Sequence, residues 1–396
     1  MNDTESFATD PRRSEAPRPA DQGRTGEGTR AVRAGLPAPA EHRPALPGPV
    51  FAAHYHLSGD PTGPYTYGRD ENPTWTLLEA AVGELEAPGH EDVTTLVFAS
   101  GMAAISAVLF SRLSAGDAVV LPDDGYQVLP LVRARLEAFG VEVRTVPTAG
   151  WDRLDALDGA RLVWLETPSN PGLDVCDVRS IATAAHKAGA LVAVDNTLAT
   201  PLGQRPLELG ADFVVASGTK QLTGHGDLLL GYVAGRAGAA MEAVRHWRKI
   251  AGAVAGPMES WLAHRSIATL HLRVERQAVT ALRVAEALRT RPEVTGLRYP
   301  GLPDDPSHRI ASRQMRHHGC VVSFVLPCRA HADRFLRAAR LVDEATSFGG
   351  VRSTAERRGR WGGDAVEEGF VRLSVGVEDP EDLIRDLFRA LDAAAD

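Results

Sequence analysis

Short apolar segments alternate with helix-like segments from Trp75 to about Pro257, and this alternation narrows the possible folds more than any other property of the sequence. The apolar segments are nearly continuous, which is typical of parallel strands that helices cover on both faces. They span residues 94–99, 117–121, 141–146, 161–166, 190–195 and 212–217, and 227–235 adds one more strand. We therefore predict a three-layer α/β domain with a mainly parallel sheet.

The rest of the chain shows three other patterns. Residues 1–28 are rich in Pro, Arg, Ser and Gly and cannot bury enough apolar surface to fold, so we expect a disordered tail. Residues 29–75 have little periodicity and are typical of an arm that contacts a neighbouring subunit. A long helical stretch at 258–291, followed by further strand-like and helix-like segments, predicts a smaller C-terminal α/β domain with an antiparallel sheet. The predicted divisions are thus 1–28, 29–75, 76–257 and 258–396.

Charge and cysteine content exclude several classes of protein. The net charge is −8, so we expect no surface for nucleic acid. No apolar run reaches the ~18 residues that a membrane span needs, and no secretory signal is visible, so we expect a cytoplasmic protein. The three scattered cysteines predict neither disulfides nor a metal site, and we expect all of them (Cys176, Cys320 and Cys328) to be buried.

The strongest local signal is the segment SGTKQLTGHGD at 217–227, which begins where an apolar segment ends. Ligand sites in α/β sheets lie at the carboxyl ends of strands. This position offers the hydroxyls of Ser217 and Thr219 to a phosphate and the amine of Lys220 to a carbonyl. Only three lysines occur among 43 basic residues, so a solvated surface lysine is the weaker interpretation.

Polar groups follow other apolar segments as well. Asp195 either pairs with a cation such as a protonated pyridine nitrogen or caps the turn that follows it. Asn170 offers an amide donor, although Ser-Asn-Pro is also ordinary turn chemistry. The backbone amides of Gly101 and Met102 lie at a predicted strand-to-helix junction, which suits a phosphate.

Two further side chains are candidates for binding. Tyr126 either lays its aromatic face on a cofactor ring or packs in the core. Arg372 is a lone arginine in the apolar segment 370–375. A buried guanidinium there fits a carboxylate in bidentate fashion, and the alternative is an edge strand that faces water.

In this order the motifs resemble the cysteine/methionine-metabolism branch of fold-type I pyridoxal-phosphate enzymes, from 29-TRAVRAG-35 to the last helix. The resemblance implies pyridoxal phosphate as cofactor, Lys220 as Schiff-base lysine and proton carrier, Asp195 on the pyridine nitrogen and Tyr126 stacked on the ring. The implied phosphate ligands are Gly101, Met102, Ser217 and Thr219. The implied ligands of the substrate α-carboxylate are Arg372, Asn170 and Ser347.

The resemblance also implies an assembly. In 65-YTYGRDENPTW-75, Tyr67 and Arg69 match a pair that in this family reaches the phosphate of the neighbouring subunit's cofactor. A homodimer, normally part of a homotetramer, is therefore expected.

Three departures from the family pattern concern the substrate end. Gln127 and Val128 stand where two glycines and a threonine are usual, and 355-AERRGRWGGD-364 replaces a His-Pro stretch. Arg352 stands in place of an acid that touches the distal end of the substrate. We expect Arg352 to repel an ammonium there, unless it faces solvent or pairs with Glu356.

The resemblance implies a carbon–sulfur lyase of amino-acid metabolism and transsulfuration. We expect γ-elimination from a γ-substituted L-amino acid such as cystathionine, with Lys220 and Tyr126 as catalytic residues. The alternatives are γ-replacement, or a specialised γ-lyase that acts on an unusual, for example halogenated, amino acid. A non-catalytic relative of the same fold is disfavoured because Lys220, Asp195 and Arg372 are all present.

Overall fold

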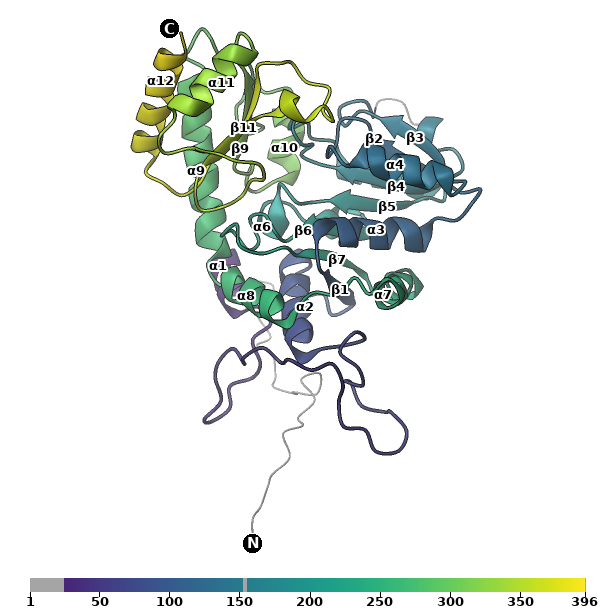
Figure 1. The fold of residues 1–396 in the computed structure, drawn as a ribbon. Coiled ribbons are helices and arrows are strands. Elements are labelled where there is room, and N and C mark those ends of the chain that lie inside the picture. The colour runs from purple at the N-terminus through teal and green to yellow at the C-terminus, as the bar shows by residue number, and fades with distance from the viewer. Residues whose placement is uncertain (1–24, 152–154, 396) are drawn as a thin grey trace.

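Seven strands form the larger of two sheets in the computed structural model, which describes residues 25–151 and 155–395 (Figure 1). Their order is β1-β7-β6-β5-β4-β2-β3. The strands are β1 (Val93–Phe98), β2 (Ala118–Pro122), β3 (Glu142–Val146), β4 (Ala160–Glu166), β5 (Leu191–Asp195), β6 (Phe213–Ser217) and β7 (Gly231–Arg236). β7 runs antiparallel to both β1 and β6, whereas the other neighbours are parallel, so the sheet is mainly parallel as predicted.

Helices cover both faces of this sheet because alternate strand residues point to opposite sides. On β4, Trp164 packs into one apolar cluster with α3, α4 and α7, while Val163 packs into another with α5. The helices of this part are α2 (Pro73–Glu86), α3 (Gly101–Arg112), α4 (Leu129–Ala138), α5 (Val178–Lys187), α6 (Thr200–Gly203) and α7 (Ala239–Ala251), with short 3₁₀ turns η3 (Asp155–Leu157) and η4 (Pro206–Leu209). The three-layer prediction is confirmed.

Polar side chains start several of these helices. Asn72 accepts a hydrogen bond from the amide of Thr74 at the start of α2, and Ser100 accepts one from Ala103 at the start of α3. Such caps satisfy backbone N–H groups that have no partner within the helix. The cap at Ser100 fixes the point where the chain leaves β1 and enters α3.

The smaller sheet has five strands in the order β10-β11-β12-β9-β8 and is antiparallel except between β10 and β11. Its strands are β8 (Thr295–Arg298), β9 (Val321–Val325), β10 (Asp343–Glu344), β11 (Thr354–Arg357) and β12 (Phe370–Ser374). The helices of this part of the chain are α8 (Pro257–Ile267), α9 (Leu270–Leu288), α10 (His308–Gln314), α11 (Arg329–Ala338), α12 (Pro380–Ala395) and the turn η5 (Arg358–Trp361). Of these, α8 packs on α2 of the larger part and not on the smaller sheet. The helical stretch expected at 258–291 is thus two helices, which separate at Ala268–Thr269.

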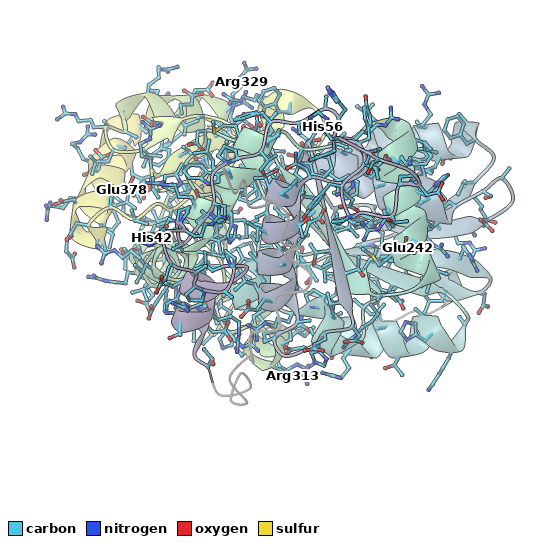
Figure 2. All side chains as sticks on the ribbon, turned by 90° about the horizontal axis from the view of Figure 1, so that it is seen from below. His42, His56, Glu242, Arg313, Arg329 and Glu378 are labelled. Atoms are coloured by element: carbon cyan, nitrogen blue, oxygen red, sulfur yellow. The ribbon has the colours of Figure 1, made fainter. Side chains whose placement is uncertain are left out.

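The arm lies outside both sheets, at the bottom of Figure 1. Figure 2 looks onto that side of the molecule and labels His42 and His56 on the arm. Helix α1 (Glu27–Arg33) begins within the segment expected to be a tail, and the Glu27 carboxylate pairs with Arg205. The tail boundary at residue 28 is therefore too late, because an ion pair anchors the chain from Glu27; residues 1–24 lie outside the described residues.

Candidate active site

Lys220 lies three residues beyond β6, where the two sheet-containing parts of the chain meet. Its Nζ donates a 2.7 Å hydrogen bond to Ser347 Oγ and lies 5.0 Å from the centroid of the Phe348 ring. Burial lowers the pKa of Lys220 to about 8, and the nearby positive charge of Arg372 acts in the same direction. The neutral amine, which is the form that attacks a carbonyl, is therefore much more populated near neutral pH than in a solvated lysine.

Asp195 ends β5 and is paired in register with Glu166 at the end of β4. Its side chain is buried, at 8% exposure, and Oδ1 accepts a 3.0 Å hydrogen bond from the amide of Thr197. Burial raises the pKa of Asp195, while the charge of Lys220 acts against this rise. The carboxylate thus caps the turn and, because it is buried at the end of β5, is also placed to pair with a cation.

The N-terminus of α3 lies against Ser217. A Cβ atom on Gly101 would come within 2.7 Å of the Ser217 Cβ, so only glycine permits this approach. Within the described part of the chain, the amides of Gly101 and Met102 have no backbone or side-chain acceptor. Two free amides at the positive end of a helix, beside a serine hydroxyl, suit an anion such as phosphate.

Thr219 has a different local role. Its hydroxyl accepts a 3.0 Å hydrogen bond from the amide of Leu230 and donates a 3.2 Å bond to the carbonyl of the same residue. The side chain therefore braces the loop that carries Lys220, and its predicted contact with phosphate stays a prediction.

Glu166 is a buried carboxylate that sequence reasoning did not single out, although it begins the motif that contains Asn170. Its Oε2 accepts a 2.7 Å hydrogen bond from the amide of Tyr126, and its Oε1 accepts a 2.9 Å bond from the amide of Asn170. Burial raises the pKa of Glu166 well above its usual value, and the neighbouring charge of Asp195 adds to the rise. Glu166 thus positions Tyr126 and Asn170, whose roles were predicted.

Arg372 lies on β12 between β11 and β9, so the alternative of a water-facing edge strand is wrong. Its side chain is 4% exposed, and burial lowers its pKa to about 10. One Nη donates to Asn170 Oδ1 at 2.7 Å, and the other donates to the Ser347 carbonyl at 3.0 Å and to Glu356. The three predicted carboxylate ligands are therefore brought together beside Lys220.

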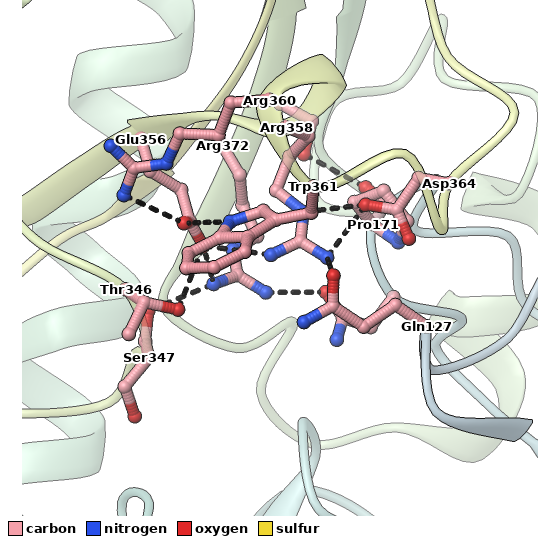
Figure 3. Close-up of polar contacts among 12 residues, drawn as sticks. Gln127, Pro171, Thr346, Ser347, Glu356, Arg358, Arg360, Trp361, Asp364 and Arg372 are labelled. Carbon is pink, nitrogen blue, oxygen red and sulfur yellow. Dashed lines mark hydrogen bonds and ion pairs between the residues drawn. The ribbon is translucent and has the colours of Figure 1, made fainter. Parts of the chain in front are cut away.

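A second buried cluster adjoins Arg372 and joins two of the departures noted in the sequence (Figure 3). Arg358 is 1% exposed and donates to Glu356 Oε1 at 2.8 Å, to Gln127 Oε1 at 3.0 Å and to Asp364 Oδ2 at 2.6 Å. Glu356 also contacts Arg372, so one carboxylate bridges the two guanidinium groups. Gln127 and the segment 355–364 are separate departures in the sequence, and only the fold brings them into contact.

Tyr126 adjoins this cluster and is half-buried. Burial raises the pKa of its hydroxyl, and the positive charges of Arg358 and Arg372 act against the rise. The phenol is thus close enough to both guanidinium groups to sense their charge.

The other predicted site residues lie apart. Arg352 is exposed. The partners of Glu356 are Arg372, Arg358, Arg360, Trp361 and Thr346, so the suggested pair of Arg352 with Glu356 is absent from the described structure. Tyr67 is 44% exposed on the arm, with the Arg69 guanidinium 5.2 Å from its ring centroid. Neither Tyr67 nor Arg69 contacts the Lys220 cluster within the described part of this single chain, and their roles stay predictions.

Cysteines and metal ligands add nothing to the site. Cys176 and Cys320 are buried, whereas Cys328 is exposed, so the expectation for Cys328 is wrong. The reason is local: Cys328 lies beyond the end of β9, at the start of α11. Among the described residues, no group of three His, Cys, Asp or Glu side chains is placed to hold a metal ion.

Comparison with known proteins decides what this arrangement is. Residues 50–392 match the family described as Cys/Met metabolism PLP-dependent enzyme. The chain belongs to this family. The expected fold-type I architecture and the expected cofactor, pyridoxal phosphate, are thereby confirmed.

Several relatives of this family member are similar over almost their whole length. A Streptomyces coelicolor protein with the provisional name cystathionine γ-lyase is 79% identical, over 93% of this chain and 94% of its own. An L-methionine γ-lyase from Pseudomonas putida is 38% identical, over 93% and 98%. The crystal structure of a methionine γ-lyase from Micromonospora echinospora superposes with a TM-score of 0.85 at 38% identity, covering 93% of this chain and 99% of that one.

The described residues fit pyridoxal phosphate. Lys220 offers an amine of lowered pKa to the aldehyde, the buried Asp195 carboxylate can pair with the pyridine nitrogen, and Gly101 at the start of α3 lies against Ser217 where a phosphate is expected. Tyr126 would lie on the ring. The aromatic side chain, the carboxylate and the amine thus come from three different strand ends of one sheet edge, as in α/β ligand sites generally.

Proposed function

We propose that this enzyme eliminates the γ-substituent of an L-amino acid, with cystathionine as the first candidate substrate. The observation that carries the proposal is the contact of the Lys220 amine with Ser347, whose carbonyl also binds Arg372. A substrate whose α-carboxylate lies on Arg372 and Asn170 would have its α-carbon close to this amine. The relatives named as cystathionine and methionine γ-lyases support the same reaction class.

The bound cofactor would supply an electron sink for the pair left when the α-proton is removed. The chain's own residues do the remaining work. Lys220 accepts the α-proton and then a β-proton, and Asp195 keeps the ring nitrogen protonated. Arg372 and Asn170 hold the α-carboxylate, and Tyr126 donates a proton to the leaving group.

The overall reaction balances without an oxidant. The bond between Cγ and the substituent breaks, and the substituent leaves with a proton. Water then hydrolyses the remaining carbon–nitrogen bond. With cystathionine the products are cysteine, α-ketobutyrate and ammonia.

The second candidate is γ-replacement, because a cystathionine γ-synthase from Mycobacterium tuberculosis is also 38% identical over 93% of this chain. In that reaction a thiol takes the place of the γ-substituent on the γ-carbon. The product is a new amino acid, and neither ketoacid nor ammonia is released. A specialised γ-lyase for a halogenated or otherwise unusual amino acid is the third.

Assembly and location are part of the proposal. The exposed pair of Tyr67 and Arg69 supports a homodimer in which each arm completes the partner's phosphate site, and two such dimers would form a tetramer. No described helix has the length and apolar character of a membrane span. We propose a cytoplasmic location in keeping with a small-molecule amino-acid substrate.

One assay separates these candidates. The purified holoenzyme is incubated with cystathionine, homocysteine, O-acyl-homoserines and γ-halogenated amino acids, with and without added cysteine. Release of α-ketobutyrate and ammonia without a thiol supports elimination. A thioether product that forms only with added thiol, with little ketoacid, contradicts elimination and supports γ-replacement.

A further inference from the structure

The buried cluster around Arg358 contains groups that the proposed reaction does not use. Its guanidinium is enclosed, yet it belongs to neither the predicted cofactor ligands nor the α-carboxylate ligands. Arg358 comes from η5, Gln127 from the chain just after β2 and Asp364 from the loop beyond η5 (Figure 3). The hydrogen bonds between them show which of their polar atoms are already satisfied.

Gln127 has a fixed orientation. Its Oε1 accepts from Arg358, so its amide nitrogen must point the other way. Within the described chain this nitrogen has no acceptor, and Gln127 adjoins Tyr126, the residue proposed to serve the leaving group. Two N–H donors, on a side chain held by a buried positive charge and next in sequence to Tyr126, are therefore left to bind an acceptor such as a carboxylate.

Asp364 presents the opposite chemistry. Its side chain is 2% exposed, and Oδ2 takes both the Nε and one Nη of Arg358. Its Oδ1 is buried and has no hydrogen-bond partner among the described residues. A buried carboxylate oxygen without a donor is costly, and an ammonium group is the natural donor for it.

Asp364 lies close to Gln127. A Cβ atom on the preceding residue, Gly363, would be 3.3 Å from the Gln127 Cβ. The segment that carries Asp364 therefore packs directly on Gln127. Residues 361–363 are exposed, and binding of a ligand group at Oδ1 requires this surface segment to shift.

We propose that Gln127, Arg358 and Asp364 bind an amino-acid head group at the leaving-group end of the substrate. The Gln127 amide, held by Arg358, takes the head group's carboxylate, and Asp364 Oδ1 takes its ammonium. This inference rests on the proposed γ-elimination and names the substrate class within it: amino acids whose γ-substituent carries its own amino-acid group. The exposed Arg352 is not required for this selection.

Four substrates test the two contacts separately. Cystathionine carries both distal groups, S-aminoethyl-L-homocysteine only the ammonium, S-carboxyethyl-L-homocysteine only the carboxylate, and methionine neither. Each kcat/KM is expressed relative to methionine for wild type, Asp364→Asn and Gln127→Met. Glu344→Gln is the matched control, because it weakens an exposed pair with Arg360 in the same region and Glu344 contacts none of Gln127, Arg358 and Asp364 in the described structure.

Asp364→Asn should lower the relative kcat/KM for cystathionine and for the aminoethyl substrate about 10-fold or more. The relative kcat/KM for the carboxyethyl substrate should not change. Gln127→Met should show the reverse pattern for the two single-group substrates. Glu344→Gln should change none of these ratios. Equal changes across all substrates, or no change in the ratios, would overturn the inference.

Failure of the proposed function is seen separately. If wild type releases ketoacid from none of the four substrates, γ-elimination is wrong. The dissociation constants of the same compounds, from changes in the visible absorbance of the bound cofactor, then replace kcat/KM. The same two selective losses support the head-group site, and unselective or unchanged binding overturns it. The melting temperature of each variant with its cofactor excludes misfolding as the cause.

Discussion

Ser347 contacts Lys220 through its hydroxyl and Arg372 through its carbonyl, at 2.7 Å and 3.0 Å. Its φ of 79° lies in the left-handed region, which non-glycine residues seldom adopt. The following residues bring Phe348 under both cations and Gly349 against the backbone of Gln221. One short turn of the smaller domain thus holds the reactive amine and the proposed carboxylate ligand together.

The first prediction concerns the pKa of Lys220. Burial lowers it from 10.5 to about 8, and only the neutral amine captures an aldehyde. The rate at which the apoenzyme captures pyridoxal phosphate should therefore rise with pH, with its midpoint near pH 8, and level off at higher pH. Stopped-flow absorbance across a pH series measures this rate. A midpoint near 10.5 would show that the amine is solvated.

The second prediction concerns Asp195. Asparagine keeps the hydrogen bond from the Thr197 amide but cannot keep a ring nitrogen protonated. Turnover of Asp195→Asn should fall roughly 100-fold or more, since loss of a buried charge partner costs several kcal/mol. Asp195→Glu, which keeps the charge, should retain more activity. Full activity in Asp195→Asn would show that Asp195 serves only to cap the turn.

The third prediction concerns stability. Glu86 is fully buried at the end of α2 and accepts a hydrogen bond from the Tyr232 hydroxyl. Burial raises its pKa from 4.5 to about 7. Its contribution to stability is therefore full below about pH 4.5 and is lost as the pH rises through about 7.

Replacing this carboxyl by a neutral amide removes that loss. Glu86→Gln should be stabilised relative to wild type at pH 8, by on the order of 3 kcal/mol at most, with little gain at pH 5. Denaturant unfolding at fixed protein and cofactor concentration measures the difference. A gain of the same size at both pH values would mean that ionisation of Glu86 is not its cause.

The fourth prediction concerns assembly. If Arg69 completes the partner's phosphate site, Lys220→Ala and Arg69→Ala chains combined in one dimer restore one complete site. Purified heterodimers, carrying different affinity tags, should recover activity that neither homodimer has. A fully active monomer by light scattering, or verified heterodimers without activity, would contradict shared sites.

The apolar patterns were enough to predict the large sheet, because strands buried on both faces must be apolar along their length. Once the strands were predicted, the positions of Asp195 and Lys220 at their carboxyl ends could be predicted as well. The break between α8 and α9 was missed because neither Ala268 nor Thr269 is a strong helix breaker. Ser347 was assigned to the substrate site only because of the family resemblance.

Contacts between distant segments could not be predicted from pattern. Gln127 and Arg358 are 231 positions apart, and each looked like a separate departure from the family. Glu166 was overlooked because its neighbours Pro168 and Asn170 are typical of a turn. Their partners are fixed by tertiary packing, which local sequence does not encode.

The most direct test of the whole account is the fate of the three lysines. Wild type and the variants Lys220→Ala, Lys187→Ala and Lys249→Ala are loaded with pyridoxal phosphate, reduced with borohydride and digested, and the modified peptide is identified by mass spectrometry. The adduct should lie on Lys220 in wild type and in the two control variants, with γ-elimination retained. Lys220→Ala should have neither adduct nor turnover. A reducible adduct on another lysine, together with wild-type activity in Lys220→Ala, would contradict it.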